Sequence, residues 1–159
     1  MGKKMLIIIG SIVVLFVALF FVIDYKNNQA LDSNENPYGT NDLSQSTIDQ
    51  LDDPLYQNQI LPEELNEKIS NKEEVTVYFY SPECVYCQNT TPYLAPLAED
   101  MDVDMKKYNL LEFGQQGISY GIESTPTVVH YEDGEEVSRL VGQYPKEDYE
   151  AFFNEYVLN

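Results

Sequence analysis

The chain offers few ligands for a metal ion. Its 159 residues include two cysteines, one histidine and no tryptophan. A structural zinc site normally needs four Cys or His ligands, whereas Cys84, Cys87 and His130 supply only three. A zinc site shared between two chains is the alternative that this count leaves open, and we expect neither a metal nor a cofactor.

The chain is also poor in positive charge. Nine lysines and arginines stand against 27 aspartates and glutamates, and the formal net charge is −18. All the acidic residues follow residue 23, where only seven basic residues remain. This balance repels phosphate backbones and anionic lipid, so it disfavours binding to nucleic acid and docking on an anionic membrane surface. A well-solvated acidic surface is the simplest interpretation.

Charge is absent altogether from one segment near the N-terminus. Met5–Ile23 contains 19 residues without a charged side chain, and about 20 apolar residues span a bilayer as a helix. A cleaved signal peptide is the alternative, but its apolar core is shorter and small residues precede its cleavage site. Here the run ends in FFVID. We therefore expect residues 1–23 to be an uncleaved transmembrane anchor.

The flanks of this segment predict its orientation. Lys3 and Lys4 precede it, whereas only Lys26 follows closely, beside Asp24. By the positive-inside rule the N-terminus stays in the cytoplasm. The sequence therefore predicts a single-pass protein of the cell membrane whose remaining residues are extracytoplasmic, where disulfide chemistry is possible.

A polar segment follows the anchor. Residues 24–58 are rich in Asn, Asp, Ser and Gln, with few apolar residues and no sustained period. Such a composition favours a flexible stalk between membrane and domain. Within it, Ile48–Leu51 is a candidate for a short turn that packs on the domain.

Residues 59–159 have the pattern of one compact α/β domain. VTVYFY at residues 75–80 is apolar on both faces, as in a buried central strand. The other expected strands are 103–108, 125–131 and 137–141, and the expected helices are 62–69, 84–100, 113–120 and 146–157. Pro92 and Pro96 predict a kinked or broken second helix. The order of these elements gives a parallel β-α-β unit followed by an antiparallel hairpin, and hence a mixed sheet flanked by helices.

Cys84-Val85-Tyr86-Cys87 is the motif that carries chemistry. A structural disulfide at this spacing closes a tiny loop and stabilises little, because the entropic gain grows with loop length. Covalent haem attachment needs a histidine after the second cysteine, and residue 88 is Gln. A redox-active dithiol remains. Cys84 follows a strand and opens a helix, whose unpaired N–H groups and dipole favour a thiolate, and Cys87 lies one turn later, within reach of its sulfur.

Residues 60–159 resemble the thioredoxin-like family. VTVYFYSPECVYC is similar to the strand and CxxC of that family, and Pro92 matches its helix proline. TPTVVHY at residues 125–131 resembles the segment that carries its cis-proline, and Gly142 matches the glycine of its last strand. The resemblance implies that Cys84 attacks and Cys87 resolves, with a redox disulfide forming between them.

The resemblance also implies a substrate site. Pro126 would lie in a cis bond beside the cysteines, and the backbone of Thr125 would pair with an extended substrate segment. Tyr86, between the cysteines, is a further candidate for substrate contact.

Three departures from the family pattern bear on the redox properties. The two residues between the cysteines are Val85 and Tyr86, and a tyrosine at the second of these positions resembles disulfide isomerases and reductases. Tyr78 occupies the place of the buried aspartate that thioredoxins use for proton transfer. Glu83 precedes Cys84, and its negative charge opposes thiolate formation. We therefore expect a mildly acidified Cys84, which slightly favours the reductase or isomerase direction over the oxidase direction.

The sequence thus predicts a membrane-anchored protein-disulfide oxidoreductase that acts on exported protein or peptide disulfides. With no third cysteine, a separate membrane redox partner would recycle the dithiol. The alternative is an accessory or binding module that assists secretion of an exported peptide without net redox turnover.

Overall fold

The computed structural model describes residues 2–31 and 36–158, which form two compact units, Met1–Asn41 and Asp42–Asn159. The first unit contains helix α1 (Lys3–Leu31). Its stretch Lys3–Gln29 is long and apolar enough to cross a membrane. By length, composition and position it fits a membrane anchor and a signal sequence equally well.

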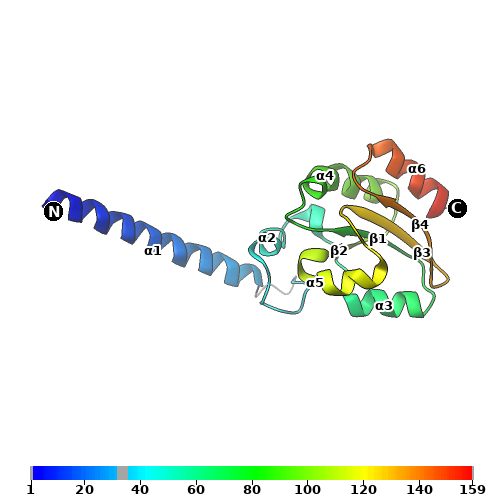
Figure 1. The fold of residues 1–159 in the computed structure, drawn as a ribbon, viewed down its shortest axis with the longest axis horizontal. Helices are drawn as coiled ribbons and strands as arrows, with labels where there is room; N and C mark the ends of the chain where they lie inside the picture. Colours follow the sequence, from blue (N-terminus) through cyan, green and yellow to red (C-terminus); the bar gives the residue numbers. More distant parts are fainter. Residues whose placement is uncertain (1, 32–35, 159) are drawn as a thin grey trace. The chain divides into compact units, whose positions relative to one another are not determined.

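The second unit is built on a four-stranded sheet in the order β2-β1-β3-β4 (Figure 1). Strands β1 (Val75–Tyr80) and β2 (Met105–Asn109) run parallel, whereas β3 (Thr127–Glu132) and β4 (Glu135–Val141) add antiparallel pairs. The predicted mixed α/β sheet is confirmed. Its register brings the C-terminal ends of β1 and β2 and the N-terminal end of β3 to the same end of the sheet.

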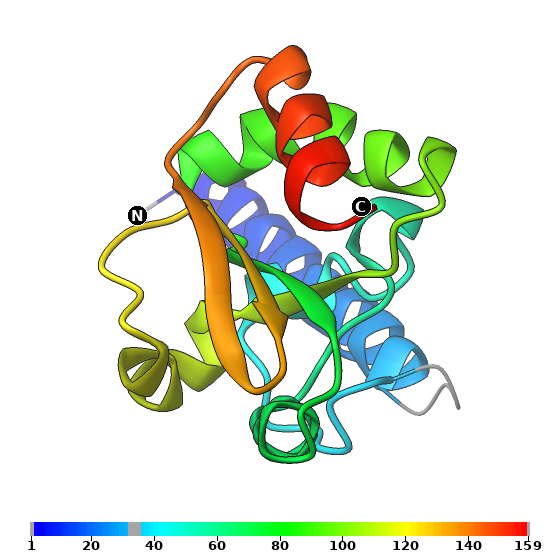
Figure 2. The ribbon, with the colours of Figure 1, turned by 90° about the vertical axis from the view of Figure 1, so that its right-hand side faces the viewer.

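Helices cover both faces of the sheet (Figure 2). Alternate residues of β1 enter two separate cores, because successive strand side chains point to opposite faces. Tyr78 and Tyr80 pack with the buried faces of α4 (Val85–Asp100) and α6 (Lys146–Tyr156). Val77 and Phe79 pack in the other core, to which α3 (Pro62–Ser70) contributes Leu65 and α5 (Leu110–Gly117) contributes Leu110. Every residue of β1 is buried, as its sequence predicts.

Two helices differ from the expectations. Helix α4 runs without interruption through Pro92 and Pro96, because Leu94 and Leu97 bury one side of it against the sheet. The helix expected at residues 113–120 starts earlier, since the side chain of Asn109 caps α5 by accepting a hydrogen bond from the N–H of Leu111. A short 3₁₀ helix, η2 (Ile118–Tyr120), completes that stretch.

The second unit extends into the segment that the sequence marks as a stalk. The second unit begins at Asp42 rather than at residue 59, and α1 continues past the predicted anchor to Leu31. Residues 42–56, which we call the strap, contain α2 (Gln45–Ile48) and the 3₁₀ helix η1 (Pro54–Tyr56).

The strap is fastened by a buried hydroxyl. Thr47 is 1% exposed, and its hydroxyl donates to Glu112 Oε1 at 2.6 Å while accepting from Asn109 Nδ2 at 3.1 Å. The backbone N–H of Ser44 donates to the same carboxylate oxygen at 3.0 Å. A polar segment is therefore ordered because its polar groups find partners in the domain.

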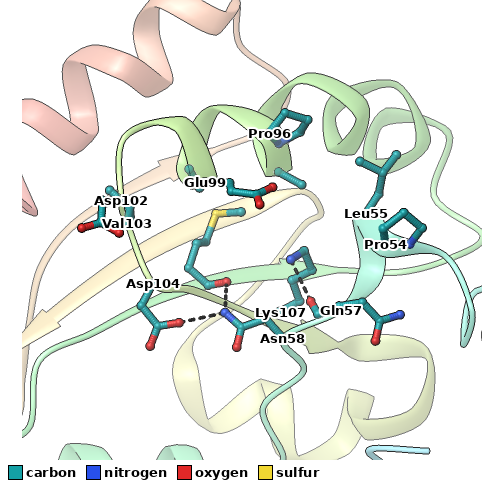
Figure 3. A pocket seen from close by; sticks show the side chains of 13 residues that line it. Pro54, Leu55, Gln57, Asn58, Pro96, Glu99, Asp102, Val103, Asp104 and Lys107 are labelled. Carbon is teal, nitrogen blue, oxygen red and sulfur yellow. Dashed lines mark hydrogen bonds between the residues drawn. The ribbon is translucent and has the colours of Figure 1, made fainter. Parts of the chain in front are cut away.

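A cavity of about 670 Å³ lies between η1, the end of α4 and β2 (Figure 3). Lys107 of β2 reaches into this region, is only 6% exposed, and donates from Nζ to the carbonyl of Gln57 at 2.8 Å. Burial lowers the pKa of Lys107 to about 8, because the charged ammonium is removed from water. The ammonium at neutral pH is therefore a cost to stability.

We expect Lys107→Met to raise the stability of the second unit by about 1–2 kcal/mol at pH 7, since relief of the buried charge exceeds the lost hydrogen bond. The pKa of Lys107 is lowered from 10.5 to about 8 on folding. The unfolded chain therefore binds more protons in that window, and wild-type stability rises with pH across it. Urea unfolding at several pH values checks both effects.

Lys106→Met is the matched control, because Lys106 lies beside Asp104 at 3.2 Å and its side chain is partly exposed. This variant should gain much less stability at pH 7 and should keep most of the rise in stability between pH 8 and 10.5, because burial lowers the pKa of Lys107 more than the Lys106 charge does. A Lys107→Met protein that is no more stable than wild type, or that keeps that rise, contradicts the assignment.

Candidate active site

Cys84 stands at the start of a helix, immediately after the central strand. It is the N-cap of α4, with extended backbone angles, and its Sγ accepts a hydrogen bond from the N–H of Cys87 at 3.3 Å. The Cys84 side chain thus satisfies one of the N–H groups that a helix start leaves without a partner. Both cysteines are free thiols, and Cys84 is partly exposed whereas Cys87 is 1% exposed.

The segment before β3 meets these cysteines from across the sheet. The Thr125–Pro126 peptide bond is cis, and the Cys84 thiol donates to the carbonyl of Thr125 at 3.4 Å. The N–H of Gly142 donates to the carbonyl of Pro126 at 2.7 Å, which ties the end of β4 to the same place. The fold therefore brings Cys84, Cys87, Thr125 and Pro126 together from segments about 40 residues apart.

The two thiols differ in acidity. Partial burial raises the pKa of Cys84, but interactions with the Cys87 and Thr125 side chains and with the N–H groups of Cys87 and Tyr86 outweigh it, so the pKa is lowered overall. Burial raises the pKa of Cys87 to about 12. Cys84 is therefore the thiol that ionises first, which suits an attacking nucleophile.

A family model described as thioredoxin matches residues 57–155. This match covers more than half of the chain. The chain belongs to the thioredoxin family. Membership makes thiol–disulfide oxidoreduction the class of activity of this chain.

Relatives in sequence support the assignment. A thioredoxin from Porphyra purpurea is 32% identical over 93 residues, which are 57% of this chain and 87% of that protein. A thioredoxin from Mycoplasma genitalium is 33% identical over 92 residues, 57% of this chain and 90% of that protein.

Solved structures agree. A thioredoxin variant from Halobacterium salinarum NRC-1 is 30% identical, with a TM-score of 0.52 over 62% of this chain and 86% of that one. Thioredoxin f2 from Chlamydomonas reinhardtii, 23% identical, has a TM-score of 0.54 over 61% of this chain and 93% of that one, which supports the fold.

In this member of the thioredoxin family, the hydroxyl groups of Thr91 and Tyr78 form a chain of hydrogen bonds that ends at the carbonyl of Cys87. The Thr91 hydroxyl donates to the carbonyl of Cys87 at 2.8 Å and shares a 3.0 Å hydrogen bond with the hydroxyl of Tyr78. Because the single Thr91 proton goes to Cys87, Tyr78 is the donor of the second bond. Burial raises the pKa of Tyr78, so its hydroxyl stays protonated.

Tyr56, on η1, also interacts with Thr91 and lies within electrostatic range of Cys87. The sequence draws attention to Tyr78 but not to Thr91 or Tyr56, whose roles depend on packing between α4 and the strap. Burial has the largest effect on the pKa of Cys87, followed by hydrogen bonds with Cys84, the backbone of Ser81 and Thr125. None of these groups is a carboxylate.

The remaining predicted residues of the site lie at its surface. Tyr86 and Val85 are 62% and 64% exposed, so both are available to a bound molecule. Glu83 is exposed, as expected, but it has a partner that the sequence does not reveal, since the hydroxyl of Ser46 in the strap donates to its Oε1 at 2.9 Å.

His130 lies away from the dithiol. Its Nδ1 is 2.9 Å from the Thr76 hydroxyl in the sheet, and desolvation lowers its pKa. Among the residues that the structure describes, no group of three His, Cys, Asp or Glu side chains is arranged to hold a metal ion.

The asymmetry of the thiols gives a titration prediction. We expect Cys84 to ionise at a lower pH than an ordinary cysteine, and Cys87 to stay protonated until about pH 12. Thiolate absorbance of the reduced protein measures this. The Cys87→Ser variant keeps a donor beside Cys84 and assigns the first transition, and the Cys84→Ser variant should lack it. A first transition that survives in Cys84→Ser contradicts the order of ionisation.

Proposed function

We propose that this chain is a membrane-anchored protein-disulfide oxidoreductase in which Cys84 attacks and Cys87 resolves. The observation that carries the proposal is the difference between the two thiols. One is partly exposed, more acidic than usual and beside the Thr125 carbonyl, while the other is buried one helical turn away.

The reductive cycle follows from this arrangement. The Cys84 thiolate attacks one sulfur of a substrate disulfide, the substrate S–S bond breaks, and the second substrate sulfur leaves as a thiolate that takes up a proton. Cys87 then loses its proton and attacks Cys84. The substrate leaves with both its cysteines reduced, and two electrons have passed from the enzyme, which now holds a Cys84–Cys87 disulfide.

Run in reverse, the same steps donate a disulfide. The reductase or isomerase direction is favoured, because a strong oxidant needs a very stable attacking thiolate. Here the lowered pKa of Cys84 rests on local hydrogen bonds, and Glu83 places a negative charge directly before it. No lysine, arginine or histidine occurs in the segment SPECVYCQ.

Substrate contact is assigned to Tyr86, Thr125 and Pro126. Tyr86 presents an exposed aromatic ring two residues after Cys84. The backbone of Thr125 lies beside Cys84 and is suited to pair with an extended chain. An exposed ring and an extended backbone fit a protein or peptide substrate better than a small molecule.

The proposed location is the outer face of the cell membrane, with α1 as a single-pass anchor and the N-terminus in the cytoplasm. The length and apolar composition of α1 and the flanking Lys3 and Lys4 support this. Since the chain has only two cysteines, a separate membrane redox partner is proposed to recycle the dithiol.

The Cys87→Ala variant tests this function. Without the resolving thiol, substrates should accumulate on Cys84 as mixed disulfides, because the second exchange step is removed. Affinity capture from membranes followed by non-reducing and reducing electrophoresis detects them, and mass spectrometry identifies the bonded cysteine.

The double variant Cys84→Ser, Cys87→Ser is the control and should trap nothing. An oxidoreductase loses its cellular phenotype in this variant, whereas an accessory module that only binds exported peptide keeps it. Absence of any reducible adduct on Cys87→Ala, with the phenotype retained by the double variant, would falsify the proposal.

A further inference from the structure

Acidic residues stand in the segments that meet at the dithiol. Glu83 directly precedes Cys84, Glu112 lies in the first turn of α5, and Glu123 stands two residues before Thr125. Glu83 and Glu123 are exposed. All three belong to segments that follow or precede strand ends at the end of the sheet where the cysteines lie.

Basic residues are missing from the chain segments at the same end of the domain. No lysine or arginine occurs in the segments that meet there, which are residues 42–60, 81–90, 109–126 and 141–145. Lys146, at the start of α6, is the first basic residue to follow them along the chain.

The other basic residues of the second unit stand outside these segments, although the side chain of Arg139 reaches one of them. Lys68 pairs with Glu73 at 3.0 Å. Lys72 approaches the turn between β3 and β4, at the opposite end of β3 from Thr127. Arg139 is paired with Glu136 and donates to the carbonyls of Tyr120 and Gly121. Lys106 and Lys107 lie on β2, and Arg139 interacts electrostatically with Glu123. The segment around Cys84, residues 81–90, is therefore the part of this end where acidic charge has no basic neighbour along the chain.

The strap binds the carboxylate of the residue that directly precedes the reactive cysteine in the chain. Ser46 donates to Glu83, and the adjacent Thr47 is held by Glu112 and Asn109. One lone pair of Glu83 is thus engaged, and its exposed carboxylate keeps further acceptor capacity for an incoming cation. A mobile surface side chain would gain less from such a contact, because it would have to be ordered on binding.

On the proposed function, we infer that the substrates of this dithiol carry positive charge next to the cysteine that Cys84 attacks. The recognised chemistry is a basic peptide segment, with lysine or arginine beside Glu83 and over the exposed ring of Tyr86. Aromatic rings attract such cations through their faces, and a cleft of one sign raises the encounter rate with ligands of the other sign.

A positively charged substrate also affects the ionisation of the Cys84 thiol. Glu83 directly precedes Cys84 in the chain, and a negative charge close to a thiol disfavours its ionisation because like charges repel. A substrate cation beside Glu83 neutralises that field at the moment of attack. The positive charge therefore favours both the encounter and the thiolate, and an acidic flank does neither.

Two peptides closed by the same disulfide test the inference, one with lysines and one with glutamates flanking its cysteines. With the full-length reduced protein in a neutral detergent, the basic peptide should be reduced at least about tenfold faster in low salt. In about 1 M salt, where the Debye length is about 3 Å, the preference should shrink to a few-fold. Single-turnover formation of the Cys84–Cys87 disulfide is the readout.

The Glu83→Gln variant should lower the ratio between the reduction rates of the basic and the acidic peptide, whereas Glu135→Gln should leave this ratio unchanged. Glu135 begins β4 at the far end of the hairpin, about 15–20 Å along the strand from Thr127. Equal rates for the two peptides, or an equal response of the preference to both variants, overturn the inference and leave the proposed function standing. Failure to reduce either peptide overturns the proposed function itself.

Discussion

The chemistry of this protein depends on one local arrangement, the capping of helix α4 by the sulfur of Cys84. The N–H of Cys87 donates to that sulfur, as an N–H donates to a serine or aspartate oxygen at other helix starts. A capping group of this kind is more stable as an anion, because the helix start carries partial positive charge. The same geometry places Cys87 one turn further on, where burial keeps it protonated.

This arrangement is held by the rest of the fold. The fully buried strand β1 ends just before the motif, and two aromatic-rich cores clamp it from opposite faces. The antiparallel partner β3 starts at the same end of the sheet and delivers the carbonyl of Thr125 to the sulfur. The strap contacts the same end of the sheet through hydrogen bonds from Ser46 to Glu83 and from Thr47 to Glu112. Acidity, exposure and local charge at Cys84 thus come from four separate segments.

Much of this arrangement could be predicted from the sequence. The strand at residues 75–80 is apolar on both faces, and the helix after Cys84 and the hairpin at residues 127–141 follow local patterns. The strap could be predicted only in part. The sequence marks Ile48–Leu51 as a turn that packs on the domain, and Leu51 is buried, but the anchoring of Thr47 depends on partners more than 60 residues away. The extent of α4 follows from the sequence, but the break that its two prolines suggested does not occur, because tertiary packing overrides local propensity.

The central claim is that Cys84 and Cys87 form one two-electron redox couple. Equilibrating the full chain in glutathione buffers of graded potential, then alkylating free thiols and measuring intact mass, tests it directly. The account predicts a single transition between a doubly alkylated species and an unalkylated one, with a slope for two electrons. A chain that stays doubly alkylated at every potential, or that accumulates as a singly alkylated glutathione adduct, would contradict it.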